Sequence, residues 1–197
     1  MDREFDIKTL KENLQGGLSG YRPRPFWSWN DDLKKEELLR QIDQMKEKGI
    51  GGFFMHARGG LKTEYLSKEW FDCIRACTER AKELGMEAWG YDENGWPSGF
   101  AGMKLLEDSA NHEQYLVRKV GDFDPSANAS YLVKDGKCAR VSESKGEGEY
   151  INVYVKTNPS VVDVMNPAIV RKFIDLTHER YKKELGDDFG KYMLGFF

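Results

Sequence analysis

The run IGGFFMHAR, residues 50–58, determines the fold that this sequence predicts. It is a short apolar segment of strand length that ends on His56 and Arg58. Similar apolar runs lie on either side of it, at residues 26–29 and 86–93. A helical pattern separates each pair of runs. Strands that alternate with helices in this way predict right-handed βαβ units and a parallel sheet covered by helices.

Both segments between the runs carry helix signals. Residues 30–32 supply capping oxygens before the first helix, and Gly49 is placed to end it. Ser67 is placed to cap the second helix and Gly85 to end it. The apolar stripes consist of Leu38, Leu39, Ile42 and Met45 in the first helix and of Trp70, Phe71, Ile74, Cys77, Ala81 and Leu84 in the second.

The strand–helix alternation stops after residue 102. Three or four β-like runs follow, and Asp135-Gly136 between two of them is a strong hairpin signal. The α/β pattern resumes at Asn166-Pro167, which predicts one helix that ends at Gly186, before a fourth apolar strand at residues 192–197. The expected buried stripe of that helix is Val170, Phe173, Ile174, Thr177 and Tyr181.

We therefore expect an α/β fold, a partial (half) TIM-type β/α barrel of about four parallel strands with flanking helices and a small antiparallel β insertion, since a full barrel needs about 250 residues. The expected parts are an N-terminal helix and lead-in (1–22), the first three β/α units (23–102), the insertion (103–160), and a helix with the fourth strand (161–197). A half barrel leaves two strand edges unpaired, so self-association through residues 192–197 or 25–29 is expected.

Composition narrows the functional classes. The 197 residues include 30 basic and 33 acidic side chains, which gives a net charge of −3. The chain therefore lacks the excess of positive charge that is typical of nucleic-acid-binding proteins. No apolar run approaches the ~20 residues of a membrane helix, so no membrane partner is expected. The three cysteines are too few for a disulfide framework. The charged N-terminus lacks the apolar core of a signal peptide, which favours a cytoplasmic location, while a secreted or periplasmic parent protein remains compatible with the sequence.

Polar and aromatic side chains follow the three apolar runs, where the carboxyl ends of parallel strands place active sites. Carboxylates and amides can bind sugar hydroxyls, and indole rings stack on the apolar face of a pyranose, so this set suits a carbohydrate. Trp27 and Trp29 are expected to point to opposite faces, so that at most one of them faces the site. The candidates are Trp29, Asn30, His56, Arg58, Asp92, Glu93 and Trp96.

Simpler explanations exist for the same residues. Asp92 and Glu93 could cap a loop or pair with Arg58, and a lone His56 is often a core histidine. His112 and His178 have no partner pattern and are interpreted as structural. The chain lacks the glycine-rich nucleotide-binding signatures, the HExxH zinc motif and the GxSxG nucleophile elbow.

Three motifs, PFWSWN (25–30), MHARGG (55–60) and YDENGWPSG (91–99), resemble the opening of the barrel in glycoside hydrolase family 106, the α-L-rhamnosidase-like proteins. The resemblance covers residues 24–102 and 162–197. It implies a (β/α)8 barrel with a β insertion after the third strand, hydrolysis of a terminal sugar by two carboxylates, and a calcium ion near the sugar. The sequence itself identifies no cofactor.

Within this resemblance, Glu93 and Asp92 are the candidate catalytic residues, and Trp29, Asn30, His56, Arg58 and Trp96 are candidate substrate-binding residues. Family members carry a further acidic residue just after the fourth strand, so we expect the full catalytic pair to be absent from these 197 residues. Two alternatives stay open: a non-catalytic carbohydrate-binding domain, and a barrel enzyme of another class. An aldolase would need a buried lysine at a strand end, and none of the four strands supplies one.

Overall fold

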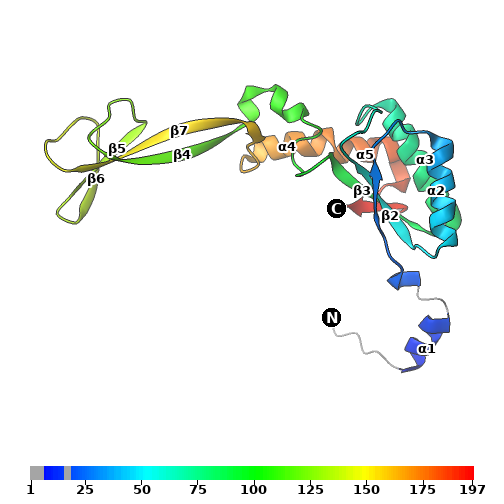
Figure 1. Ribbon diagram of the computed structural model, residues 1–197. Helices are drawn as coiled ribbons and strands as arrows, with labels where there is room; N and C mark the ends of the chain where they lie inside the picture. Colours follow the sequence, from blue (N-terminus) through cyan, green and yellow to red (C-terminus); the bar gives the residue numbers. More distant parts are fainter. Residues whose placement is uncertain (1–6, 16–18) are drawn as a thin grey trace. The chain divides into compact units, whose positions relative to one another are not determined.

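A computed structural model describes residues 7–15 and 19–197 and divides them into two compact units (Figure 1). The first unit comprises the described residues up to Gly102 together with Arg171–Phe197. The second unit comprises Met103–Val170, which extends ten residues beyond the insertion expected from the sequence. In the described part of the chain, no helix is long and apolar enough to cross a membrane.

The first unit is built on a parallel sheet. Its strands are β1 (Phe26–Trp29), β2 (Gly52–Ala57), β3 (Glu87–Asn94) and β8 (Met193–Phe196), and they pair in the order β1-β2-β3-β8. All three pairings are parallel, so the expected strand order is confirmed. Gly52 allows the close approach of β2 to β3, because a Cβ atom there would lie 2.4 Å from the carbonyl oxygen of Glu87.

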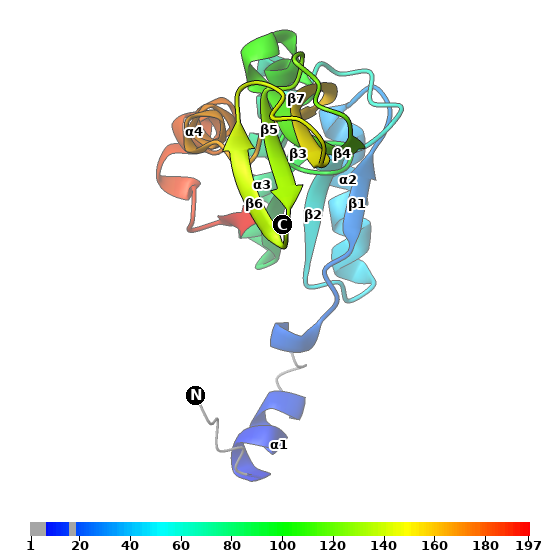
Figure 2. The same cartoon turned by 90° about the vertical axis from the view of Figure 1, so that its left-hand side faces the viewer.

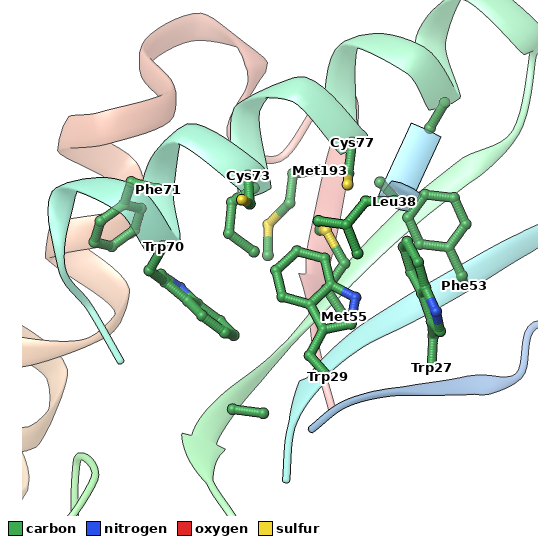
Figure 3. Close-up of a cluster of buried hydrophobic side chains, with 14 of the residues drawn as sticks. Trp27, Trp29, Leu38, Phe53, Met55, Trp70, Phe71, Cys73, Cys77 and Met193 are labelled. Atoms are coloured by element: carbon green, nitrogen blue, oxygen red, sulfur yellow. The ribbon is translucent and has the colours of Figure 1, made fainter. Parts of the chain in front are cut away.

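Helices cover one face of this sheet. They are α2 (Lys35–Glu47), α3 (Lys68–Leu84) and α5 (His178–Leu185), and Figures 1 and 2 show α2 and α3 on the same side of β1 and β2. The helices α1 (Ile7–Gln15) and α4 (Pro167–Leu176) complete the α-helices of the described chain. Figure 3 shows the core between α3 and the sheet, where the Trp29 and Trp70 ring centroids lie 5.0 Å apart. Cys73 and Cys77 are buried free thiols of this core.

Trp27 and Trp29 both face the helices. They are 9% and 1% exposed, and Trp27 packs against Phe53 while Trp29 packs against Trp70. The expectation that they point to opposite faces is wrong, because residues two apart in a strand share a face. Trp29 is therefore a core residue and does not line a substrate-binding surface, in contrast to what the sequence predicts.

The helix signals are confirmed for α3 and only in part elsewhere. Ser67 Oγ accepts a hydrogen bond from Trp70 N, and Gly85 ends α3 in the left-handed conformation at φ +61°. In contrast, α2 begins after Lys34 without a side-chain cap. The expected capping residues Asp31 and Asp32 are instead paired with Lys62 and Lys34.

The single helix expected between Pro167 and Gly186 is interrupted at Thr177. Asn166 Oδ1 accepts from Ala168 N and caps α4 as expected. Thr177 then leaves the helical conformation, with φ −109° and ψ −84°, and its hydroxyl donates to the carbonyl of Phe173 at 2.7 Å. This bond from a threonine to the carbonyl four residues earlier bends helices. Val170, expected in the buried stripe, is 36% exposed.

The second unit is a four-stranded antiparallel sheet, as expected. Its strands β4 (His112–Gly121), β5 (Ala129–Lys134), β6 (Lys137–Val141) and β7 (Glu149–Val162) pair in the order β4-β7-β5-β6. The hairpin between β5 and β6 turns at Asp135 and Gly136, which both have positive φ values. Two positive φ values are what a type I′ turn requires, so the hairpin signal is confirmed.

Candidate functional site

The face of the parallel sheet opposite α2 and α3 carries a pocket of about 400 Å³, a volume within the range of small-molecule sites. We call it the aromatic pocket. Its residues come from β1, β2, β3, the loops after β2 and β3, and the residue after β8. On β1 and β2 they follow the two-residue period that separates this face from the helix-covered one. The lining residues are Phe26, Ser28, His56, Arg58, Tyr91, Trp96 and Phe197.

Tyr91 lies at the centre of the rings in this pocket. Its ring centroid is 3.9 Å from that of His56, and the Trp96 ring lies nearly parallel to it at 6.3 Å. Tyr91 is 1% exposed, and its hydroxyl has no hydrogen-bond partner among the described residues. Trp96, in contrast, is 71% exposed. The pocket therefore offers a buried aromatic floor and one indole ring that is open to solvent.

His56 and Arg58 supply the polar groups at the end of β2. Burial lowers the pKa of His56, and the positive charge of Arg58 adds to this effect, whereas the contact of Nε2 with the carbonyl of Gly95 opposes it. His56 is therefore a neutral imidazole at pH 7. The exposed Arg58 forms no ion pair within the described residues, so it supplies the positive charge of the aromatic pocket.

Glu93 holds the loop that follows β3. It is 1% exposed, and its carboxylate accepts hydrogen bonds from the backbone N–H groups of Asn94, Phe100, Ala101 and Gly102. A carboxylate has about four lone-pair positions, so these four donors occupy them. The simpler explanation for an acidic residue here, that it caps a loop, describes Glu93 better than catalysis does.

Asp92 remains partly accessible, with 14% of its side chain exposed. Its Oδ1 accepts a hydrogen bond from Ser98 Oγ at 2.6 Å, and its Oδ2 lies 3.4 Å from His178 Nε2. Neither acidic residue pairs with Arg58, which rules out that explanation in this structure. The sequence shows no partner pattern for His178, and the structure places its ring beside Asp92.

The structure brings three of the sequence candidates, His56, Arg58 and Trp96, together in the aromatic pocket. Trp29 lies in the core, and Asn30 lies exposed after β1, outside the residues that line the pocket. Sequence reasoning missed four lining residues. Phe26 and Ser28 could have been found by counting along β1 from Trp27 and Trp29, which face the helices. The other two are Tyr91 and Phe197.

A calcium ion, implied by the family resemblance, does not fit the residues described. Residues 7–15 and 19–197 contain no group of three or more His, Cys, Asp or Glu side chains that could hold a metal ion. Calcium takes six to eight oxygen ligands, and the four hydrogen bonds to Glu93 leave that carboxylate occupied.

Replacing Glu93 with Gln should destabilise the first unit by about 2–4 kcal/mol, because an amide NH₂ would face backbone N–H donors that lose their acceptor. Urea unfolding measures this change. The matched control Asp92→Asn keeps an acceptor for Ser98 and should cost about 1 kcal/mol or less. Equal losses for the two variants would contradict the structural assignment of Glu93.

The pKa of His56 predicts a specific pH dependence of stability. Because the folded-state pKa lies below the ordinary 6.5, the unfolded chain takes up the proton first as the pH falls. Stability should therefore decrease from about pH 6.5 down to the folded-state pKa, and His56→Gln should remove this component. Proton NMR titration of the ring measures the pKa, which Arg58→Gln should raise without restoring 6.5. A folded-state pKa above 6.5 would refute the prediction.

No protein-family model matches the chain, and no curated protein matches it. Among solved structures, the chain is similar to the rhamnosidase from Novosphingobium sp. PP1Y, with 24% sequence identity and a TM-score of 0.46. The match covers 62% of this chain and 11% of that rhamnosidase, so the chain spans a small part of the other protein's length.

Proposed function

We propose that this chain forms part of the sugar-binding site of a glycoside hydrolase, similar to the α-L-rhamnosidases, that acts on the terminal sugar of a glycan or glycoside. The observation that carries the proposal is the aromatic pocket, in which the exposed ring of Trp96 lies beside the polar groups of Ser28, His56 and Arg58. Arg58 and Trp96 follow the carboxyl ends of β2 and β3, where such folds bind ligands.

The chemistry of the pocket matches the two sides of a sugar ring. The C–H groups of a pyranose can pack on the indole of Trp96, which is exposed and therefore needs no rearrangement to accept it. The hydroxyl edge can then reach the guanidinium of Arg58, the neutral imidazole of His56 and the hydroxyl of Ser28. Arginine and neutral imidazole supply both donors and an acceptor, which a polyhydroxylated ligand requires.

The same residues do not support hydrolysis by this chain alone. Glycoside hydrolysis typically uses two carboxyl groups that flank the scissile bond. Glu93 is saturated by backbone donors, which leaves Asp92 as the one partly accessible carboxylate at this end of β3. This observation favours a second candidate function, a carbohydrate-binding domain without catalysis. The two candidates share the aromatic pocket and differ in whether a second carboxylate completes it.

Trp96→Ala should weaken binding of L-rhamnose to the chain at least tenfold, because the variant loses the stacking surface. Amide NMR titration measures the affinity and identifies the residues that respond. The matched control Tyr115→Ala removes an exposed aromatic ring from the second unit and should leave the affinity unchanged. The wild-type chain should also release no aglycone from an aryl α-L-rhamnoside.

Two outcomes would overturn this proposal or part of it. Rhamnose binding that survives Trp96→Ala, or that perturbs residues outside the aromatic pocket, would refute the assigned site. Hydrolysis that Asp92→Asn abolishes would show that the chain supplies enough of the catalytic apparatus by itself. The prediction that the chain alone does not catalyse hydrolysis would then be wrong, while the proposed sugar-binding site would stand.

We further propose that the chain self-associates through the edges of its parallel sheet. β1 and β8 are the outer strands of this sheet, and each carries backbone groups that can pair with another strand. Exposed apolar side chains accompany both edges, among them Phe26 and Leu194.

Sedimentation equilibrium should therefore show dimers or larger species whose proportion increases with concentration. Leu194→Lys should shift the equilibrium toward monomer, because a lysine on an edge strand opposes pairing. Leu116→Lys, an exposed leucine of the second unit, serves as the matched control and should have no effect. A monomer at every concentration would contradict the proposal.

A further inference from the structure

Three buried polar side-chain atoms have no hydrogen-bond partner among the described residues: Trp29 Nε1, Tyr65 Oη and Tyr91 Oη. The first two belong to the hydrophobic core that packs beneath the helices. Tyr91 lies outside that core cluster and lines the aromatic pocket, although it is only 1% exposed. Buried hydroxyls are normally hydrogen-bonded, because an unpaired one costs free energy. An unpaired hydroxyl in the lining of a pocket therefore points to a partner that comes from outside the chain.

Tyr91 stands in a row of polar groups that crosses three neighbouring strands. Ser28 on β1 and His56 on β2 are register partners, and the ring centroid of Tyr91 on β3 lies 3.9 Å from that of His56. Burial raises the pKa of Tyr91 and lowers that of His56, and the positive charge of Arg58 acts on both groups. Strand register, ring contact and charge thus bring these four residues together on one face of the sheet.

Each of these four groups has hydrogen-bonding capacity that the described residues do not use. The hydroxyl of Ser28 and the guanidinium of Arg58 form no hydrogen bond or ion pair with them. The neutral ring of His56 contacts the carbonyl of Gly95 through Nε2, which leaves Nδ1 as an acceptor. Because burial raises the pKa of Tyr91, its hydroxyl keeps its proton at pH 7 and can donate. The row therefore offers both donors and an acceptor, the combination that ligand hydroxyls require.

Burial also determines how strongly the hydroxyl of Tyr91 can act. A polar group in water must give up its hydration before it bonds a ligand, which cancels most of the gain. The hydroxyl of Tyr91 loses its hydration when the chain folds, so a ligand oxygen that reaches it gains the bond without that cost on the protein side. Arg58 and Trp96, which line the same pocket, are exposed, and exposed side chains change rotamer on the picosecond to nanosecond timescale. A ligand can therefore displace them as it enters.

We infer that Tyr91 is the specificity-determining residue of the aromatic pocket, and that its buried hydroxyl bonds one particular ring hydroxyl of a pyranose. Trp96 supplies a stacking surface that many sugars can use, whereas Tyr91 responds to the position of a single oxygen. A pyranose without that hydroxyl leaves Tyr91 unpaired and is discriminated against. The identity of the ligand as a sugar rests on the proposed function, and selection by a buried hydroxyl rests on the surroundings of Tyr91.

A double-mutant cycle between Tyr91 and the ligand tests this inference. The full chain and its Tyr91→Phe variant are titrated by amide NMR with methyl α-L-rhamnopyranoside and with its 2-deoxy, 3-deoxy and 4-deoxy analogues. Tyr91→Phe should lower the affinity for the parent glycoside at least tenfold. One deoxy analogue should bind the wild-type chain at least tenfold more weakly than the parent does. Tyr91→Phe should leave the affinity for that analogue unchanged, because the bond is already lost, and the analogue thereby identifies the selected hydroxyl.

Thermal unfolding separates selection by Tyr91 from a structural role. Tyr91→Phe removes an unpaired buried hydroxyl, so the Tm should stay the same or rise while the affinity falls. The matched control Tyr65→Phe removes a buried, unpartnered hydroxyl in the core, where Tyr65 packs against Trp70 with ring centroids 5.1 Å apart. It should leave the sugar affinity unchanged. A Tm that falls with Tyr91→Phe, or equal affinities of the wild-type chain and Tyr91→Phe for the parent glycoside, would overturn the inference.

A second probe separates this inference from the proposed function. If the rhamnoside binds in the aromatic pocket and Tyr91→Phe binds it equally well, the proposed function stands and selection by Tyr91 is refuted. myo-Inositol is a polyhydroxylated ring that is not a sugar. If it binds in the pocket and loses affinity at least tenfold with Tyr91→Phe, while the rhamnoside does not bind, the role of Tyr91 stands and the proposed function fails. If neither compound binds, both are refuted.

Discussion

The carboxylate of Glu93 is the interaction on which the candidate site depends. It collects four backbone N–H groups from a nine-residue segment and thereby fixes the loop between β3 and the second unit. That loop carries Trp96 into the aromatic pocket, places the carbonyl of Gly95 against His56, and directs Ser98 to Asp92. Gly95 N also donates to the carbonyl of Ala57, which joins the loop to the end of β2. Without the charge of Glu93, the buried N–H groups would lack an acceptor, and the ring of Trp96 would lose its support.

A second constraint is the two-residue period of the strands. On β1, Trp27 and Trp29 enter the core beneath the helices, so Phe26 and Ser28 must lie on the opposite face. On β2, Phe53 and Met55 are buried beneath the helices, and His56 points into the aromatic pocket. One alternation therefore produces a dry core on one side and an aromatic, partly polar surface on the other. The fold and the site are two results of the same pattern.

The two-residue period of the strands also explains which features of the fold could be predicted from the sequence. Apolar runs with glycine stops predicted the four parallel strands, their order and the antiparallel insertion, because these features depend on local patterns that the chain repeats. The role of Trp29 was predicted incorrectly because the face of a strand was assigned without counting from its neighbours. The break at Thr177 depends on a single side-chain hydrogen bond, and Thr177 also fits the apolar stripe of an unbroken helix.

The role of Glu93 could not be predicted for a different reason. Its four partners are backbone N–H groups, three of which lie seven to nine residues further along the chain, and every residue type except proline has such a group. An acidic residue at the end of a parallel strand looks the same in sequence whether it binds a ligand or accepts hydrogen bonds from the backbone of a loop. The conformation of the loop settles the difference, and that conformation is visible only in three dimensions.

Asp92, the residue before Glu93, shows how differently two neighbouring carboxylates can be used. The single hydroxyl hydrogen of Thr177 is directed to the carbonyl of Phe173, so its oxygen can only accept from Nδ1 of His178, which lies 2.9 Å away. Nδ1 then carries a hydrogen, and Nε2 faces the carboxylate of Asp92 at 3.4 Å. Glu93 is committed to holding a loop, whereas Asp92 contacts the hydroxyl of Ser98 and the imidazole of His178. The two neighbouring carboxylates therefore differ in their partners, which are backbone N–H groups for Glu93 and side chains for Asp92.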